Sequence, residues 1–250
     1  MTLERIVSFL RRTEEAIVDE VRPLPHVTAL LTPSLPLVWQ LNAVRVDDDG
    51  AGARELIGAA DAALGNVSHR KLVVHDEELG ARLAPALSRE GWNVYRLLVM
   101  VRDRAPERTA PPGAGAEVDR SRGARALSAF RREQPFGWQE EAVQQLTAMD
   151  ERYSRAIQAR DFAAPPEQPA ASCRLYTGDG LGQVDEVGTI ERRRGRGHAS
   201  AAVLAASVSR KIGSQPSAAD WPQQLYARLG FSPIGQLYEF LKLPLGSGRP

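Results

Sequence analysis

Cysteine is nearly absent from this chain of 250 residues, with Cys173 as its single example. One thiol makes neither a disulfide framework nor a cysteine-based metal site, a usage typical of a reducing compartment. The histidines, His26, His69, His75 and His198, lack the spacing of metal ligands. We therefore expect no metal centre, and we expect Cys173 to be a core residue of a strand rather than a nucleophile.

Long apolar runs are also missing. No segment approaches the roughly 20 apolar residues that cross a bilayer. Residues 1–21 alternate charged and apolar side chains, unlike the continuous apolar core of a signal peptide. The formal net charge of +1 gives the whole chain no attraction to nucleic acid or to anionic lipid. We therefore expect a cytoplasmic protein whose partners include no membrane and no nucleic acid, while a homodimer is compatible with the sequence.

Proline and glycine gather near the middle of the chain, in "RDRAPERTAPPGAGAEVD" (residues 102–119), where the apolar periodicity stops. This pattern predicts a linker at residues 106–116. It separates a domain at residues 1–105 from a second domain at residues 117–250. Both halves mix helical periodicity with short strand patterns, which predicts an α/β (α+β) fold.

Local patterns place several residues within this order. An amphipathic N-terminal helix is ended by "RPLP" at residues 22–25, and His69 and His75 are interpreted as polar residues flanking a strand. The second domain opens with two helices broken at "QPFGW". Phe136 and Trp138 in this break are interpreted first as buried packing residues, with the lining of a substrate pocket as the alternative.

The stretch "ERRRGRGHAS", residues 191–200, puts arginines and glycines directly before an alanine-rich helical segment. A strand pattern ends near Ile190 and the helix begins near Gly197, so backbone N–H groups gather at a helix N-terminus, an anion-binding geometry. Glycine lets the backbone approach an anion closely, and arginine adds bidentate contacts to phosphate oxygens. No Gly-Lys-Ser/Thr loop follows Gly195, and Ser200 stands where a dinucleotide fingerprint needs glycine or alanine. A phosphate site of another kind is therefore predicted.

Arg194 to Ala199 fit the pattern Arg/Gln-x-x-Gly-x-Gly/Ala and resemble the acetyl-CoA pyrophosphate loop of the GNAT acetyltransferase superfamily. "VDEVGT" precedes the loop at the spacing of that family's central strand, and "LYARLGF" (residues 225–231) follows it as the later helix-to-strand motif. The resemblance covers residues 117–243 and implies a mixed central sheet flanked by helices. Residues 83–101 repeat the helix, Gly-aromatic and strand order of the C-terminal end, so the first half resembles a degenerate copy in a tandem protein.

The resemblance implies a binding site for the cofactor acetyl-CoA. Val187, Gly188 and Thr189 of the central strand are implied to pair their main chain with pantetheine, as an added strand would. Gly188 fits this role because a glycine inside a strand often marks a bulge or the close approach of another backbone. The loop residues implied to lie against the CoA phosphates are Arg194, Gly195, Arg196, Gly197, His198 and Ala199.

The implied activity is transfer of an acetyl group from acetyl-CoA to a primary amine, on a small molecule or a peptide, by direct attack in a ternary complex. Amide formation needs the ammonium deprotonated and the leaving thiolate protonated. Tyr226, four residues before Gly230, has the position that often serves as general acid in this family. Glu186 is our choice of general base, with Asp185 as the alternative, and strand alternation places the two carboxylates on opposite faces.

One segment departs from the family pattern. Between a helix expected to end near Gly213 and the residue Trp221 the family has an apolar strand, whereas this chain has the short polar segment "SQPSAAD" (residues 214–220). Because a truncated strand would leave the cofactor slot incomplete, a catalytically inactive acyl-CoA-binding or assembly module is the alternative function. Nucleic-acid binding through the arginine run is a third interpretation, and it predicts strongly salt-dependent affinity.

Overall fold

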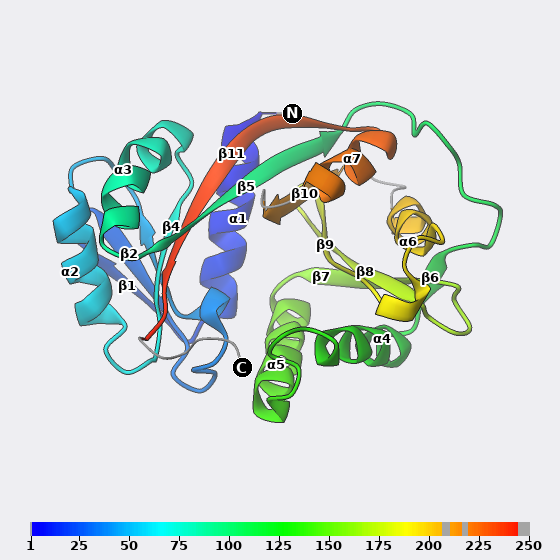
Figure 1. The fold of residues 1–250 in the computed structure, drawn as a ribbon, viewed down its shortest axis with the longest axis horizontal. Coiled ribbons are helices and arrows are strands. Elements are labelled where there is room, and N and C mark those ends of the chain that lie inside the picture. The colour runs from blue at the N-terminus through cyan, green and yellow to red at the C-terminus, as the bar shows by residue number, and fades with distance from the viewer. Residues whose placement is uncertain (1, 207–210, 217–219, 245–250) are drawn as a thin grey trace. The chain divides into compact units, whose positions relative to one another are not determined.

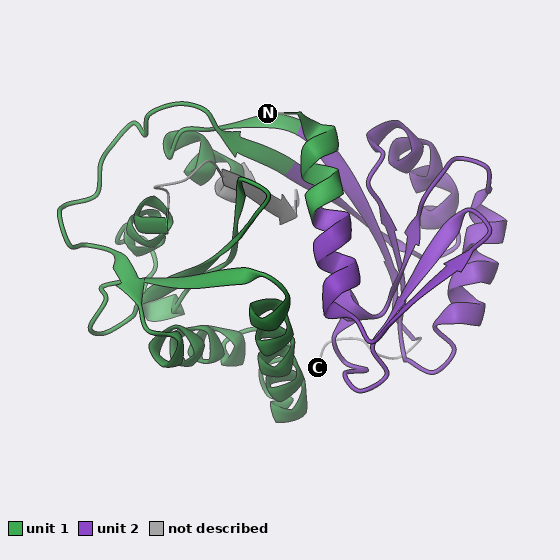
Figure 2. Ribbon diagram, turned by 180° about the vertical axis from the view of Figure 1, so that it is seen from behind, with its two compact units in different colours: residues 1–9, 99–215, 219–234 green, residues 10–98, 216–218, 235–250 purple. Residues whose placement is uncertain are grey.

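The computed structural model describes residues 2–206, 211–216 and 220–244. The chain divides into two compact units (Figure 2). Unit 1 consists of residues 1–9, 99–215 and 219–234, and unit 2 consists of residues 10–98, 216–218 and 235–250. None of the described helices is both long and apolar enough to cross a membrane.

Two long strands contribute to both units. β5 (Asn93–Arg102) leaves unit 2 after Leu98, and β11 (Phe231–Lys242) leaves unit 1 after Ile234. Residues 106–116, which the sequence predicts as a linker, belong to unit 1, where the Glu107 amide donates to the Arg228 carbonyl at 2.8 Å. The bounds of the compact units therefore fall at other residues than the expected domain boundaries.

Unit 2 is a sheet with helices on both faces. Besides parts of β5 and β11, its elements are the C-terminal part of α1 (Leu3–Ile17), β1 (Glu20–Leu24), β2 (Val27–Leu31), the 3-10 helix η1 (Trp39–Leu41), β3 (Ala43–Val46), α2 (Ala53–Ala63), β4 (Arg70–Val74) and α3 (Glu77–Arg89). The strands follow the order β1-β2-β3-β4-β11-β5. β3 and β4 are parallel, whereas the β1–β2, β2–β3 and β4–β11 pairs are antiparallel.

Alternation along the strands of unit 2 separates an apolar face from a charged one. Val44 and Val46 join the hydrophobic core against α2 and α3. Arg45, between these valines, turns to the face of α1, where its guanidinium lies 2.7 Å from Oε1 of Glu15. The period of two residues thus decides which side of the sheet each helix covers (Figure 1).

Unit 1 is built on a second set of strands. Its elements are β6 (Ala116–Val118), α4 (Arg120–Arg132), α5 (Glu140–Ala156), β7 (Gln158–Ala164), β8 (Ala171–Gly178), β9 (Leu181–Thr189), the 3-10 helix η2 (Glu191–Arg193), α6 (His198–Ala206), β10 (Lys211–Pro216) and α7 (Asp220–Arg228). The strands follow the order β5-β10-β9-β8-β7-β6, with β10 parallel to β9 and the β6–β7, β7–β8 and β8–β9 pairs antiparallel. α6 packs on one face of β7–β9, and α4 and α5 on the other (Figure 1).

The predicted α/β fold with a mixed central sheet flanked by helices is confirmed. The helix pair broken at "QPFGW" is present as α4 and α5. The N-terminal helix ends at Ile17, and most of "RPLP" lies in β1, because β1 pairs with β2 instead of forming a loop. His69 and His75 flank β4 as predicted, and both are buried, with Nε2 of His69 bonded to the Asn42 carbonyl at 2.8 Å.

The helices α3 and α7 end in the same way. Gly91 follows α3 with a φ of +80°, and Gly230 follows α7 with a φ of +88°, the left-handed conformation that favours glycine. A buried aromatic residue comes next in each case, Trp92 or Phe231, at the beginning of a long strand. The helix, Gly-aromatic and strand order predicted for both halves is therefore present in both, and the tandem interpretation stays a prediction.

Candidate functional site

A strand is present where the sequence predicts a gap. The first three residues of β10 pair in parallel with Gly182–Val184 of β9. The prediction of a helix reaching Gly213 with no strand after it is therefore wrong, since Gly213 itself lies in β10 and "SQP" continues that strand. Strand pairing uses main-chain groups, so a short polar sequence can form a strand where neighbouring strands offer partners.

The β9–β10 ladder stops at Val184, ahead of the candidate cofactor residues of β9. It covers Gly182–Val184, and among the described residues no pair joins β10 to β9 beyond Val184. On its other edge β9 stays paired with β8 as far as Thr189. The main chain of Val187–Thr189 therefore has one edge without a β10 partner, and an extended ligand can add to such an edge as a further strand.

A β-bulge interrupts β9 at Glu186. Ser172 of β8 pairs with Gly188, and Arg174 pairs with Asp185. Two residues of β9, Glu186 and Val187, therefore lie opposite the single residue Cys173 of β8. Glu186 has a left-handed φ of +53°, which costs a non-glycine residue free energy and persists only where its surroundings stabilise it. Because the extra residue breaks the alternation, Asp185 and Glu186 both face α4 and α5. The prediction that these two carboxylates lie on opposite faces is wrong.

Buried charges from α4, α5, β7, β8 and β9 meet on this face. Arg131 of α4 contacts both oxygens of Asp150 in α5, at 2.7 and 3.0 Å, and lies 3.0 Å from Oε1 of Glu186. Arg174 of β8 donates to Asp161 of β7 at 2.8 Å and lies 3.3 Å from Asp150. Arg131 is 3% exposed and Arg174 1%, so water screens these ion pairs little.

Asp185 has a different environment from its neighbour. Its carboxylate accepts from the side-chain amide of Gln183 at 3.0 Å and from the backbone N–H of Glu186 at 2.7 Å. Burial and, next, the negative charge of Glu186 raise the pKa of Asp185 to about 7. Burial also raises the pKa of Glu186, whereas the guanidinium of Arg131 opposes that rise. A carboxyl group with a pKa near neutrality can exchange a proton under physiological conditions.

The arginine-glycine loop joins β9 to α6 where the sequence predicts it. β9 ends at Thr189 and α6 begins at His198. Gly195 and Gly197 have φ values of +75° and +77°, and a Cβ on either would meet no atom within 4 Å. Backbone conformation, rather than crowding, therefore requires glycine at both positions.

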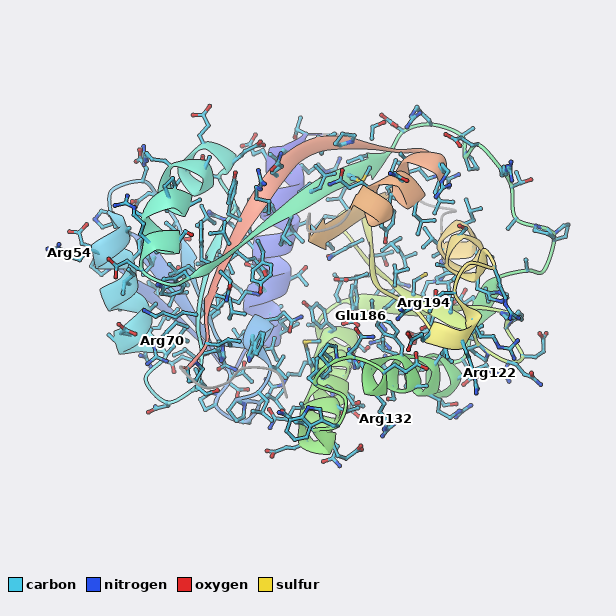
Figure 3. All side chains as sticks on the ribbon, viewed as in Figure 1. Arg54, Arg70, Arg122, Arg132, Glu186 and Arg194 are labelled. Atoms are coloured by element: carbon cyan, nitrogen blue, oxygen red, sulfur yellow. The ribbon has the colours of Figure 1, made fainter. Side chains whose placement is uncertain are left out.

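The loop offers donors and positive charge. Among the described residues, the amides of residues 195–200 donate no hydrogen bond. Arg194 donates through Nε to the Thr189 carbonyl at 3.3 Å, which links the arginine of the motif to the end of β9 (Figure 3). No ion pair is described for the exposed residues Arg192, Arg193 and Arg196. These groups fit an anion such as the pyrophosphate of CoA, with His198 and Ala199 supplying amides at the start of α6.

Two further predicted site residues lie in packed surroundings. Tyr226 of α7 is 2% exposed, and its ring stands edge-to-face on Phe231 with centroids 5.3 Å apart. A Cβ on Gly188 would stand 2.5 Å from the ring of Phe130. The crowding that requires glycine at position 188 therefore comes from a side chain of α4 rather than from another backbone, and the bulge lies at Glu186 instead.

The aromatic residues of the α4–α5 break are exposed. Phe136 is 38% and Trp138 69% exposed, so the interpretation of both as buried packing residues is wrong. Gly137 between them is tightly packed, since a Cβ there would stand 2.3 Å from the Arg132 carbonyl oxygen. Cys173 is buried in β8, and its prediction as a core residue is confirmed.

Arg131, Asp150, Asp161 and Arg174 were not predicted as site residues. They come from separate elements and form no sequence motif, so only the fold brings them together. One local signal exists, because Gly123, Leu127 and Arg131 make the buried stripe of α4 at a spacing of four residues. A charged residue in an apolar stripe needs a buried partner, and this marks Arg131 as a candidate.

Comparisons with solved structures define the fold. A conserved protein of unknown function from Staphylococcus epidermidis ATCC 12228 matches with a TM-score of 0.66 at 15% identity, over 91% of this chain and 95% of that chain. A GCN5-related N-acetyltransferase from Kribbella flavida matches with a TM-score of 0.61 at 17% identity, over 98% and 96%. A tandem GNAT protein from the clavulanic acid biosynthesis pathway matches with a TM-score of 0.52 at 14% identity, over 87% and 78%. No protein-family model and no curated protein matches the sequence.

The chain thus has a mixed-sheet acyltransferase fold that extends over both units. More narrowly, this fold is that of the GCN5-related N-acetyltransferases, and the resemblance predicted from Arg194 to Ala199 is confirmed at the level of the fold.

Proposed function

We propose that this protein transfers an acetyl group from acetyl-CoA to a primary amine of a small molecule or a peptide. The observation that carries the proposal is the succession of two binding elements along β9. The strand loses its β10 partner after Val184, and it then ends in the loop with left-handed Gly195 and Gly197. The first element offers main chain to an extended group such as pantetheine, and the second offers amides and arginines to a pyrophosphate.

The proposed reaction is direct attack. The amine nitrogen forms a bond to the acetyl carbonyl carbon while the carbon–sulfur bond breaks. A carboxylate of the bulge takes the proton that the ammonium loses, and Tyr226 donates a proton to the leaving thiolate. The nitrogen of the new amide then loses its second proton, which restores the phenol of Tyr226. Packing of the buried Tyr226 ring against Phe231 supports this role, because it holds the side chain in one orientation.

Thiol release from acetyl-CoA, measured against a panel of primary amines, tests the proposal. We expect release with at least one amine and a fall of about a hundredfold or more in Tyr226→Phe. Tyr238→Phe is the matched control, because Tyr238 is also a buried tyrosine but lies in unit 2. Equal losses in the two variants would deny Tyr226 the role of the acid.

A catalytically inactive acyl-CoA-binding module is the alternative. This alternative was based on the expected absence of a strand after α6, and the presence of β10 removes that reason for it. The two functions give different results in one experiment. The inactive module predicts that CoA binds while thiol release stays at the uncatalysed rate with every amine.

A further inference from the structure

The bulge brings two carboxylates to one face but gives them different partners. The Glu186 carboxylate contacts the guanidinium of Arg131 at 3.0 Å, and Arg131 is fixed in turn by its two contacts with Asp150. The Asp185 carboxylate is bonded to two uncharged donors, the Gln183 amide and a backbone N–H. The Glu186 carboxylate is therefore in contact with a cation, whereas the hydrogen bonds described for the Asp185 carboxylate all come from uncharged donors.

We propose that Asp185, and not Glu186, exchanges the proton with the acceptor amine, while Arg131 keeps Glu186 ionised and in place as a positioning residue. The inference rests on the proposed function, because it names the base for that reaction. It reverses the choice made from the sequence, where Glu186 is preferred on strand position alone.

The balance of buried charge on this face supports the division. The groups facing Asp185 are Arg131 of α4, Asp150 of α5, Arg174 and Tyr176 of β8, and Glu186 of β9. With Asp161 included, the described residues of this face hold four carboxylates and two guanidiniums, and the guanidiniums contact three of the four, Asp150, Asp161 and Glu186. Burying unpaired charge is costly, so one carboxyl tends to take up a proton. Asp185 is the one without a cation in contact.

Arg131 also stabilises the β-bulge at Glu186, which places Asp185 and Glu186 on the same face. Glu186 is the residue with the left-handed φ, and its side chain is attached to the last turn of α4 through Arg131. Loss of this ion pair removes the contact that repays the strain at Glu186. The bulge would then lose the feature that turns Asp185 and Glu186 to the same face.

Carbon NMR titration of the side-chain carboxyl groups tests the assignment without any substrate. We expect the Asp185 resonance to titrate with a midpoint near pH 7 and the Glu186 resonance to titrate at a lower pH than Asp185, because Arg131 contacts Glu186. In Glu186→Gln the Asp185 midpoint falls, because a neighbouring negative charge has been removed. In Arg131→Met the midpoint of the Glu186 resonance rises, because the guanidinium that lowers the pKa of Glu186 is gone, and Arg131→Lys restores the original pattern. Titration of Glu186 near pH 7 in the native protein, with Asp185 unchanged, would overturn the proposal.

The pH profile of kcat/KM gives the second readout. We expect Asp185→Asn to lose about a hundredfold or more, and Glu186→Gln to stay within about tenfold with its acid limb moved to lower pH. Glu151→Gln, on the exposed side of α5, is the control and keeps the native profile. A larger loss in Glu186→Gln than in Asp185→Asn overturns the proposal. If no amine is acetylated, the proposed function fails, and the NMR titration still decides which carboxyl carries the proton.

Discussion

The ring of Phe130 occupies the space beside Gly188, 2.5 Å from the point where a Cβ on that glycine would stand. This contact fixes α4 against the stretch of β9 proposed to bind pantetheine. It also explains a glycine inside a strand, where the residue normally costs stability.

Gly188→Ala should therefore destabilise the protein by about 1–3 kcal/mol, because the added methyl group overpacks the contact with Phe130. Urea unfolding measures the change. Gly58→Ala is the control, since a Cβ there would meet no atom within 4 Å and helix α2 should gain slightly from it. Addition of Phe130→Ala should relieve the overpacking, and a double variant with simply additive losses would contradict the account.

Arg131 and Arg132 are neighbours on α4, but they should contribute very differently to the free energy of unfolding. Arg131→Met should cost about 3–5 kcal/mol, because it removes the guanidinium that contacts Asp150 and Glu186 and leaves Asp150 with Arg174 alone. Arg132→Met should have a far smaller effect, since its pair with Glu140 is exposed. Similar midpoints of urea unfolding for the two variants would show that the buried pair is not the stabilising one.

Stability should depend on pH through Asp185. Its pKa is raised to about 7 in the folded protein, above the ordinary value of 3.8, so the folded state binds a proton that the unfolded state releases. The free energy of unfolding should then fall as the pH rises from about 4 to about 7. Asp185→Asn should flatten this fall, whereas Glu151→Gln should keep it. An unchanged pH slope in Asp185→Asn would rule out Asp185 as its source.

Arg194 should contribute to CoA affinity through its charge. Arg194→Ala should weaken CoA binding about tenfold, as expected for loss of a charge-assisted contact with a phosphate. Arg54→Ala, an exposed arginine of α2 in unit 2, is the control (Figure 3). The difference in CoA affinity between the two variants should become smaller at high salt, because salt screens exposed charges. Equal affinities for both variants at low salt would remove Arg194 from the site.

The sequence predicts the loop well because its signals are local. Glycines with left-handed φ, a strand end and a helix start all lie within the residues from Thr189 to His198. The same holds for Gly230, which has a left-handed φ of +88° directly after α7. Such positions can be predicted from the sequence because glycine is the residue that adopts a left-handed φ without steric cost.

The rest of the site depends on contacts between distant segments. β10 is polar and short, and its pairing with β9 cannot be deduced from apolar periodicity. The bulge at Glu186 interrupts the alternation of β9, which places Asp185 and Glu186 on the same face although strand alternation predicts opposite faces. Arg131 acquires its role only when α4, α5 and β9 are packed together.

Calorimetric titration of CoA into matched glycine variants measures whether β9 and its glycine loop bind CoA. Gly197 and Gly113 have nearly the same φ, +77° and +73°, and a Cβ on either meets no atom within 4 Å. Aspartate causes similar backbone strain at both, but only at position 197 does it put a negative charge in the loop. We predict that the native protein and Gly113→Asp bind CoA alike, while Gly197→Asp loses binding. Native affinity in Gly197→Asp would contradict the account.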